Sequence, residues 1–397
     1  MSFREERWMT RAQTVSMLTE RWRPPRRTEM IPLEDAAGRI CAWDVRSRNT
    51  LPVGRSAEAD GIAVRAADFR IELPDTAAWL EGRDYAMVNT GNDFDDTFDT
   101  VILIEEVSFD EGGRLKLALE GPVREGQEVA PRGSTLDEGE LLAEAGLALR
   151  PQHLCLLAAG GHRSVEVLSR PVVAYIPTGN ELVPAGEAPS RGENVESNGV
   201  MVAAFLRRWG AQPLALPVVR DRVEELEIAF DRAFAEADII LVNGGSSKGS
   251  KDHCFRLLER RAECMQHGVG CIPGIPIAAA MVGGKPAVNL PGPPFAAFCA
   301  MDWCVRPLVC FALGRAVPRR ERVEGVLLNA IKKTVGPELY VRVEATRDKD
   351  GGWRLRPFSW EDRFAVAWAR FNALMILPGE SAGCAAGQIV EAELLEE

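Results

Sequence analysis

The sequence predicts an α/β protein of several domains, in which a parallel sheet covered by helices is joined to two β-rich domains. Three observations predict this class. The chain has 397 residues, more than one ordinary hydrophobic core accommodates. Between residues 171 and 317, short apolar runs alternate with helical patterns, as in a parallel sheet covered on both faces. In residues 51–137 and 318–397, the apolar runs are short and broken by Gly, Asp and Pro, as in β-rich domains.

The same patterns divide the chain into four domains. Residues 1–50 with 138–170 are expected to form a helical linker domain, and residues 51–137 a β-rich lid domain. Residues 171–317 are expected to form the parallel-sheet α/β domain, and residues 318–397 a small C-terminal β-barrel or sandwich.

The expected helical domain contains three helical patterns. A helix is predicted over residues 10–22, where Pro24 and Pro25 end it. Residues 31–45 are expected to form an amphipathic helix that leads into a strand. A third helix begins at residue 151, directly after an Arg and with Pro in its first turn, and is closed by the glycine pair 160–161.

The remaining domains are assigned from shorter runs. The β-rich domains are expected to contain strands at 85–88, 101–104, 115–119, 339–345, 353–357 and 373–377. The α/β domain is expected to contain strands at 172–176, 214–219, 238–242 and 287–290. Its helices are expected at 198–209, 223–236, 252–261 and 295–313.

Charge and hydropathy exclude several classes of protein. The chain has 47 Lys and Arg against 58 Asp and Glu, a net charge of -11 without long blocks of one sign. This distribution argues against a nucleic-acid-coating or membrane-surface protein. No apolar stretch reaches transmembrane length, and the first residues contain no signal-peptide core. We therefore expect a cytoplasmic protein without nucleic-acid or membrane partners.

The cysteines and histidines do not indicate a metal site. The nine cysteines form no Cys-x-x-Cys pair, and several lie in apolar runs, including Cys155, Cys299, Cys304 and Cys310. They are interpreted as small buried apolar residues in a reducing compartment. The four histidines are scattered and show no ligand spacing.

The segment from Asp238 to Asp252 places an apolar strand directly before a loop of small residues. Residues 243–249 offer exposed amide hydrogens, and Lys248 and Lys251 add positive charge. A helix that starts near Asp252 would add its N-terminal dipole, so the segment suits a phosphate. The alternative is an ordinary turn after a strand.

Two further strand ends carry loops with similar features, at residues 177–182 and 291–294. Ligands of parallel sheets bind beyond the carboxyl ends of the strands. The three loops are therefore expected to border one crevice.

Six motifs occur in order along nearly the whole chain. They are IPLEDAAGR at 31–39, SAEADGIAV at 56–64, Thr90-Gly91 with Asp99 and Glu105, TGNEL at 178–182, GGSSKG at 244–249 with Asp252, and LPGPP at 290–294. In this order and spacing the chain resembles the molybdopterin molybdenumtransferase family, which includes the gephyrin E domain. The resemblance implies an elongated four-domain subunit that forms a homodimer. It also implies insertion of molybdate into adenylylated molybdopterin with release of AMP, assisted by Mg²⁺.

The resemblance also implies roles for single residues. The implied catalytic residues are Asp60, Glu181, Asp221 and Asp252, of which Glu181 and Asp252 would hold Mg²⁺ beside the anhydride. The implied substrate-binding residues are Thr90, Gly91, Thr178, Gly179, Asn198, Gly244, Gly245, Ser246, Ser247, Lys248, Gly249, Pro291, Gly292, Pro294 and Arg342. The alternative for Glu181 and Asp252 is a helix cap or a solvated acid, for Asp221 and Asn198 a helix cap, and for Asp60 and Thr90 a simple turn.

The chain departs from the family pattern where the family carries two lysines that are thought to hold molybdate. Ile272 and Ile275 occupy these positions, and Ala296 replaces an expected serine. Apolar side chains cannot balance a dianion, so the usual molybdate site is in doubt. Lys248, Lys251 and Arg342 offer compensating charge. A divergent paralogue that binds a pterin or nucleotide with another anion, or acts as a carrier or regulator, and a scaffold protein are therefore the alternatives to the enzyme.

Overall fold

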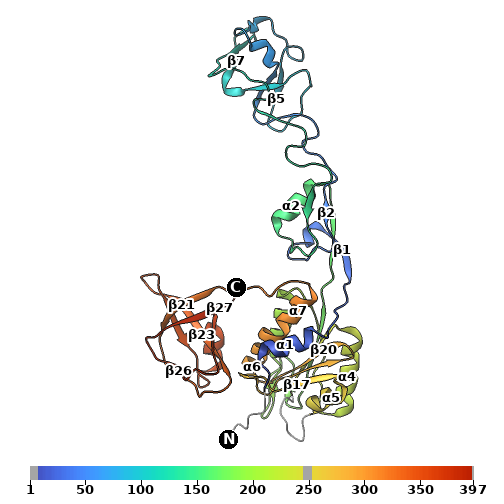
Figure 1. Ribbon diagram of the computed structural model, residues 1–397, viewed down its shortest axis with the longest axis vertical. Coiled ribbons are helices and arrows are strands. Elements are labelled where there is room, and N and C mark those ends of the chain that lie inside the picture. Colours follow the sequence, from blue (N-terminus) through green and yellow to red (C-terminus); the bar gives the residue numbers. More distant parts are fainter. Residues whose placement is uncertain (1–7, 245–252, 396–397) are drawn as a thin grey trace. The chain divides into compact units, whose positions relative to one another are not determined.

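The computed structural model describes residues 8–244 and 253–395 (Figure 1). Two compact units make up the chain. The first, called the core unit, comprises Met1–Arg27 and Ser169–Glu397. The second, called the inserted unit, is Thr28–Leu168.

A six-stranded sheet forms the centre of the core unit, in the order β15-β12-β16-β20-β19-β17. Its strands are β12 (Val172–Pro177), β15 (Gln212–Ala215), β16 (Ile239–Asn243), β17 (Cys264–His267), β19 (Ala278–Val282) and β20 (Lys285–Leu290). The first four in spatial order run parallel, which confirms the predicted strands at 172–176, 238–242 and 287–290.

The other edge of the sheet is antiparallel, and the expectation of an all-parallel sheet is wrong there. Gly283 and Gly284 join β19 to β20 with φ of 54° and 74°. A two-residue turn with positive φ at both positions fits the twist of a tight hairpin. The glycine pair therefore turns the chain straight back, where a crossover helix would be needed for a parallel neighbour.

Helices cover both faces of this sheet. Helices α4 (Val223–Glu236) and α5 (His253–Arg261) pack their apolar side chains against one face, in a core that contains Ile176, Phe230 and Val242. Helices α3 (Asn198–Arg208) and α6 (Pro294–Ala300) contact each other and the strands on the other face. From α6 the helix continues through a π-helical turn, η5 (Met301–Val305), into α7 (Arg306–Ala312), and α1 (Arg11–Thr19) packs against this stretch.

The helix Pro294–Ala312 is long and apolar enough to cross a membrane, but 78% of its most apolar window is buried inside the protein. That degree of burial is typical of a helix in a protein core. Its apolar composition is therefore explained by packing between α1, α3 and the sheet.

A closed five-stranded barrel forms the C-terminal part, as predicted (Figure 1). Its strands are β21 (Arg322–Leu327), β23 (Glu338–Arg347), β24 (Trp353–Pro357), β25 (Ala373–Leu377) and β27 (Ile389–Leu394). Pairing of β23 with β25 closes the ring. Burial alternates along β21, since one face points into the barrel. The short strand β18 (Cys271–Ile272) runs parallel to β23 and ties the barrel to the sheet domain.

The inserted unit begins with a strand pair where a helix over residues 31–45 was expected. Strand β1 (Thr28–Pro32) pairs with β11 (Ser164–Leu168) over five residues. A short 3₁₀ turn, η1 (Leu33–Asp35), follows, and Gly38 takes φ of 76°. The apolar spacing arises because Leu33, Ala36 and Cys41 enter one core from turns. The helix predicted from residue 151 is confirmed as α2 (Pro151–Ala159).

The rest of the inserted unit is built from short strands, as expected. Strands β4 (Gly61–Val64), β5 (Ala86–Val88) and β6 (Thr100–Leu103) form one sheet. The remaining pairs are β2 (Val45–Arg46) with β10 (Leu141–Ala143), β3 (Ser56–Ala57) with β9 (Val129–Ala130), and β7 (Val107–Phe109) with β8 (Leu115–Leu117).

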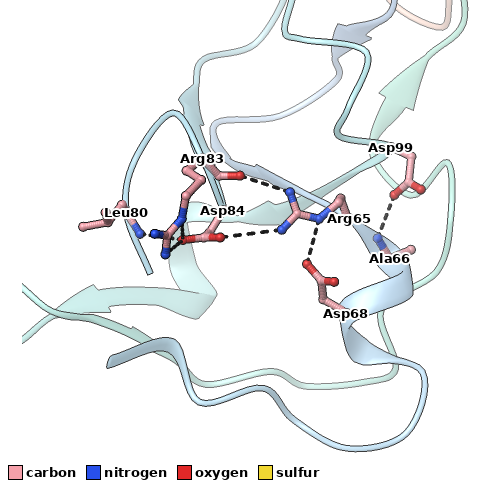
Figure 2. A network of polar contacts seen from close by, with 7 residues as sticks. All are labelled: Arg65, Ala66, Asp68, Leu80, Arg83, Asp84 and Asp99. Atoms are coloured by element: carbon pink, nitrogen blue, oxygen red, sulfur yellow. Dashed lines mark hydrogen bonds and ion pairs between the residues drawn. The ribbon is translucent and has the colours of Figure 1, made fainter. Parts of the chain in front are cut away.

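Polar contacts hold the loops after β4 in place (Figure 2). Arg65 binds Asp68 at 3.0 Å and the carbonyl of Arg83 at 3.0 Å. The hydrogen bond from Arg83 lowers the pKa of Asp84. Asp99 accepts a hydrogen bond of 2.7 Å from the backbone of Ala66, so this motif residue has a structural role.

All nine cysteines are free thiols. Cys299, Cys304 and Cys310 are buried as predicted, and burial raises the pKa of Cys304 to about 12. Cys155 is exposed on α2, which corrects the expectation that it is buried. An apolar run in the sequence therefore does not show which of its residues lie on the buried face of a helix.

A glycine substitution tests the packing of β4. A Cβ atom at Gly61 would lie 2.0 Å from the carbonyl oxygen of Ile102 on β6. We expect Gly61→Ala to lower the free energy of unfolding by about 1–3 kcal/mol, because the paired strands must separate. Thermal unfolding measures this, with Gly121→Ala as the control, since no atom lies within 4 Å of a Cβ there. Equal melting temperatures for the two variants would contradict the close contact between β4 and β6.

Candidate functional site

The carboxyl ends of the parallel strands carry the loops that the sequence singles out. Loop 178–182 follows β12, Gly244 follows β16, and loop 291–294 follows β20. Because parallel strands end at one edge of a sheet, these loops border a common region. Seven residues expected there lie outside the described part of the chain, namely Gly245, Ser246, Ser247, Lys248, Gly249, Lys251 and Asp252.

The carboxamide of Asn243 links β12, the start of α3 and the end of β20 by hydrogen bonds. Its Oδ1 accepts hydrogen bonds from the Tyr175 hydroxyl at 2.7 Å and from Asn198 Nδ2 at 2.9 Å. Its Nδ2 donates to the carbonyl oxygens of Leu290 at 3.1 Å and Pro291 at 2.7 Å. The side chain is 5% exposed, and these four bonds use its full donor and acceptor capacity.

Asn198 extends this network to the third loop. Its Nδ2 also donates to the carbonyl oxygen of Gly292 at 2.8 Å, and the side chain is 7% exposed. Asn198 is the first residue of α3 and its side chain does not cap the helix, so the helix-cap alternative is not observed. Asn198 and Asn243 together fix the backbone of residues 290–292.

Tyr175 connects the network to the start of α3. Its hydroxyl lies 2.8 Å from Oε1 of Glu196 and 2.7 Å from the amide oxygen of Asn243. Burial, followed by the charge of Glu196, raises the pKa of Tyr175, so the hydroxyl stays protonated and donates. Glu196 also accepts from the backbone of Gly199 at 2.8 Å, which fixes the first turn of α3.

The entry to the loop after β16 requires glycine. Gly244 takes φ of 121°, and a Cβ there would lie 2.5 Å from both the carbonyl and the hydroxyl oxygens of Thr178. Thr178 is buried, and its hydroxyl donates to the carbonyl of Asn243 at 3.1 Å and contacts Cys254 Sγ at 3.3 Å. The side chain of Thr178 is therefore engaged inside the fold, where it supports the loop.

Two acidic residues border the first loop. Asp221 Oδ2 accepts from the backbone of Asn180 at 3.3 Å, and Arg220 donates to the carbonyl of Asn180 at 2.7 Å. Asp221 does not cap α4, whose N-cap residue is Arg222. Glu181 is exposed, and its carboxylate lies so close to Gly179 that a Cβ there would meet it at 2.8 Å. Within the described ranges no residue donates a hydrogen bond to that carboxylate, so its oxygens are available to a cation.

The isoleucines at the two positions where the resemblance implies lysines lie near the junction with the barrel. Ile272 belongs to β18 and pairs with Leu339 of β23. Ile272 and Ile275 are both half-buried, and Ala296 is buried in α6. These positions therefore offer apolar surface and no charge.

Arg342 brings a cation of the barrel to the third loop. It is 7% exposed, and its guanidinium carbon lies 4.8 Å from the centre of the Phe295 ring, which directly follows Pro294. Burial lowers the pKa of this arginine, yet arginine stays charged at neutral pH. The position is the one that the resemblance implies for a substrate-binding residue.

In the inserted unit, Asp60 and Thr90 lie together. Asp60 Oδ1 accepts from the backbone amide of Thr90 at 2.7 Å and from its hydroxyl at 3.1 Å. Both residues are exposed, and Gly91 continues the turn with φ of 85°. The side chains of Asp60 and Thr90 thus form a hydrogen-bonded, exposed pair. This arrangement fits both interpretations of these residues, a simple turn and a contact to substrate.

A cleft of about 1540 Å³ lies elsewhere in the core unit, between α1, η5 and the barrel. Of the described residues in the three carboxyl-edge loops, none lines it. Two of its arginines are paired within the protein, Arg11 with Glu338 and Arg320 with Asp302. This cleft is therefore separate from the described part of the carboxyl-edge site.

Sequence reasoning missed the buried residues that organise the site, Tyr175, Glu196 and Asn243. A strand that ends in Asn after four apolar residues is the only signal that was present, and it also fits a simple loop start. Across residues 8–244 and 253–395, no group of three or more His, Cys, Asp or Glu could hold a metal ion.

Two family models match the chain. Residues 9–161 match the MoeA N-terminal region (domain I and II), and residues 174–310 match a probable molybdopterin binding domain. The first match includes Asp60 and Thr90 of the inserted unit, and the second includes the whole carboxyl edge of the sheet.

Similar proteins cover nearly the full length. A molybdopterin molybdenumtransferase of Haemophilus influenzae is 26% identical over 401 residues, 97% of this chain and 98% of its own. One from Bacillus subtilis is 27% identical, covering 93% of this chain and 90% of its own. The crystal structure of a molybdopterin biosynthesis protein from Pyrococcus horikosii superposes with a TM-score of 0.81, at 24% identity over 98% of this chain and 100% of that one. This last similarity shows the fold.

A substitution at Asn243 tests the network. Asn243→Asp keeps the shape but removes both donors and places a carboxylate against the carbonyls of Leu290 and Pro291. We expect a loss of at least about 3 kcal/mol in the free energy of unfolding, because one oxygen of a buried carboxylate then faces two carbonyl oxygens and has no donor. Urea unfolding measures it, with the exposed Asn329→Asp as the control. A loss no larger than that of the control would show that the carboxamide is dispensable.

Proposed function

Because the chain belongs to the molybdopterin molybdenumtransferase family, whose role is in molybdenum cofactor biosynthesis, we propose that it inserts molybdate into adenylylated molybdopterin and releases AMP. The observation that carries this proposal is the carboxyl edge of the sheet. There the buried Asn243 network fixes the start of α3 and the backbone of residues 290–292, and the carboxylates of Glu181 and Asp221, at the ends of neighbouring strands, are exposed.

The phosphates of the substrate would bind to the backbone amides after β16. Gly244 begins this loop in a conformation open only to glycine, which brings the main chain close to a ligand. Gly245, Ser246, Ser247 and Gly249 would donate to the phosphate oxygens. Asn198, Pro291, Gly292 and Pro294 would shape the other wall.

Glu181 and Asp252 would hold Mg²⁺, a hard cation that prefers carboxylate oxygens. The exposed Glu181 carboxylate, free of hydrogen bonds from the described residues, fits this role. When bound, the ion would neutralise phosphate charge as the anhydride breaks. Asp221, fixed by Asn180, would orient the groups around that bond.

Charge for the molybdate dianion would come from the loops and the barrel. Ile272 and Ile275 supply none, whereas Lys248 lies within the phosphate loop and Arg342 beside the third loop. Arg220 adds an exposed cation, held by the carbonyl of Asn180. We assign the anion to these side chains.

Asp60, Thr90 and Gly91 would complete the site from the inserted unit of a second copy. Their ordered, exposed arrangement supports this role. The protein would accordingly act as a homodimer, and we place it in the cytoplasm, where reduced thiols such as its nine are expected. The alternatives of a divergent binding paralogue or a scaffold are not favoured, since the full-length relatives are transferases.

The direct test is to incubate the purified protein with adenylylated molybdopterin and Mg²⁺ and to measure AMP with and without molybdate. We expect molybdate-dependent release. Glu181→Gln should lower kcat roughly 100-fold, as the loss of about 3 kcal/mol of transition-state stabilisation would. The exposed Glu187→Gln is the matched control. AMP release at the same rate with and without molybdate, or full activity of Glu181→Gln, would count against the proposal.

A second test locates the anion. Lys248→Ala should raise the KM for molybdate roughly 10- to 100-fold, because a hydrogen bond to a charged group is lost. Adding Ile272→Lys with Ile275→Lys should restore part of the affinity, and Lys116→Ala in the inserted unit serves as the control. Insensitivity to both changes would mean that the anion binds elsewhere.

A further inference from the structure

An exposed tryptophan is presented by a well-ordered loop of the barrel. The Trp360 side chain is 63% exposed, whereas Phe358 two residues earlier is buried. Asp362 Oδ2 accepts from the backbone and the hydroxyl of Ser359 at 2.6 and 3.0 Å. The Ser359 hydroxyl oxygen in turn accepts from the backbone of Glu361 at 3.1 Å. These hydrogen bonds constrain the backbone of the loop that carries the indole.

The indole packs against the residue that directly follows the third loop of the site. The rings of Trp360 and Phe295 are 6.1 Å apart at 63°, an edge-to-face contact. Phe295 directly follows Pro294 and is 5% exposed. Packing against a buried ring fixes the orientation of the indole, and its open surface lies beside loop 291–294.

A cation lies next to the same indole. The guanidinium carbon of Arg342 is 5.9 Å from the centre of the Trp360 ring, and Nη2 donates to the carbonyl of Ser359 at 2.9 Å. The charge of Asp362 acts on this guanidinium from a distance, but no carboxylate of the described residues forms an ion pair with it. An aromatic surface and a positive charge without a direct ion pair are thus adjacent.

This combination suits a ligand that joins a flat heterocycle to a phosphate. The heterocycle stacks on the indole through its π face, as nucleobases stack on aromatic side chains. The negative group of the same ligand is attracted by the neighbouring guanidinium. A purely apolar partner would leave that charge without a counterion in a poorly hydrated contact.

We propose that Trp360 is a stacking platform for a phosphate-bearing heterocycle of the substrate, either its adenine or its pterin. The inference rests on the proposed function and adds a specificity-determining side chain to it. Trp360 stands outside the motifs that suggested the site, in a loop 18 residues after Arg342.

Calorimetric titration with AMP and with molybdopterin tests the platform. We expect Trp360→Ala to weaken the binding of one of the two roughly 10-fold, and Trp360→Phe to stay within about 3-fold of the unchanged protein, because it keeps a ring. Weaker AMP binding identifies the adenine, and weaker molybdopterin binding the pterin. Trp43→Ala removes an indole of similar exposure, 62%, in the inserted unit and should change neither.

Folding and assembly are checked on the same variants. Unchanged circular dichroism and melting temperature are expected for Trp360→Ala, since its side chain is mostly exposed. Unchanged affinity of Trp360→Ala for both ligands would overturn the platform. If the dimer also dissociates in that variant, the indole would instead be a contact with a second copy.

The result separates the platform from the proposed function. Molybdate-dependent AMP release with unaltered KM in Trp360→Ala would overturn the platform and leave the function. Binding that depends on Trp360 in a protein that never releases AMP would overturn the function and leave the platform. A protein that binds neither ligand would overturn both.

Discussion

The geometry of the site depends on one buried carboxamide that has all its hydrogen bonds made inside the protein. Asn243 accepts from two side chains and donates to two carbonyls of the next strand end. A buried amide without partners would cost about 1–3 kcal/mol for each group left unpaired. The start of α3 and the backbone of residues 290–292 are therefore held in one arrangement relative to the end of β16.

The two positions at which the resemblance implies lysines carry apolar side chains in this chain. Positions 272 and 275 carry isoleucine at the place where the sheet domain and the barrel meet, so their side chains contribute to packing. Positive charge is found instead on a loop that follows a strand, at Arg220, and on the barrel, at Arg342. The proposed anion site would thus draw on side chains from separate elements, with Arg342 placed beside Phe295 by the barrel.

Much of the sheet domain was predictable, because buried strands and amphipathic helices leave strong local patterns. The antiparallel edge was missed, although Gly283-Gly284 is the sequence signal of a hairpin. The helix expected at 31–45 was wrong because turns can place apolar residues at helical spacing. At the site, exposed acids and glycines were recognisable by motif. Tyr175, Asn243 and Trp360 were not, since a hydrogen-bond partner or a ring contact distant in sequence has no local signature.

The closed barrel limits how this protein can associate with others. Each of its five strands has a hydrogen-bonded neighbour on both sides, since β23 pairs with both β24 and β25. Because the ring is closed and the start of β23 is already paired with β18, the barrel offers little free strand edge to another polypeptide, and strand addition is a common route to fibres and to peptide capture. A protein that binds the barrel is therefore expected to contact side chains on its outer surface or in its loops. Mutation of those side chains can then change which partner binds.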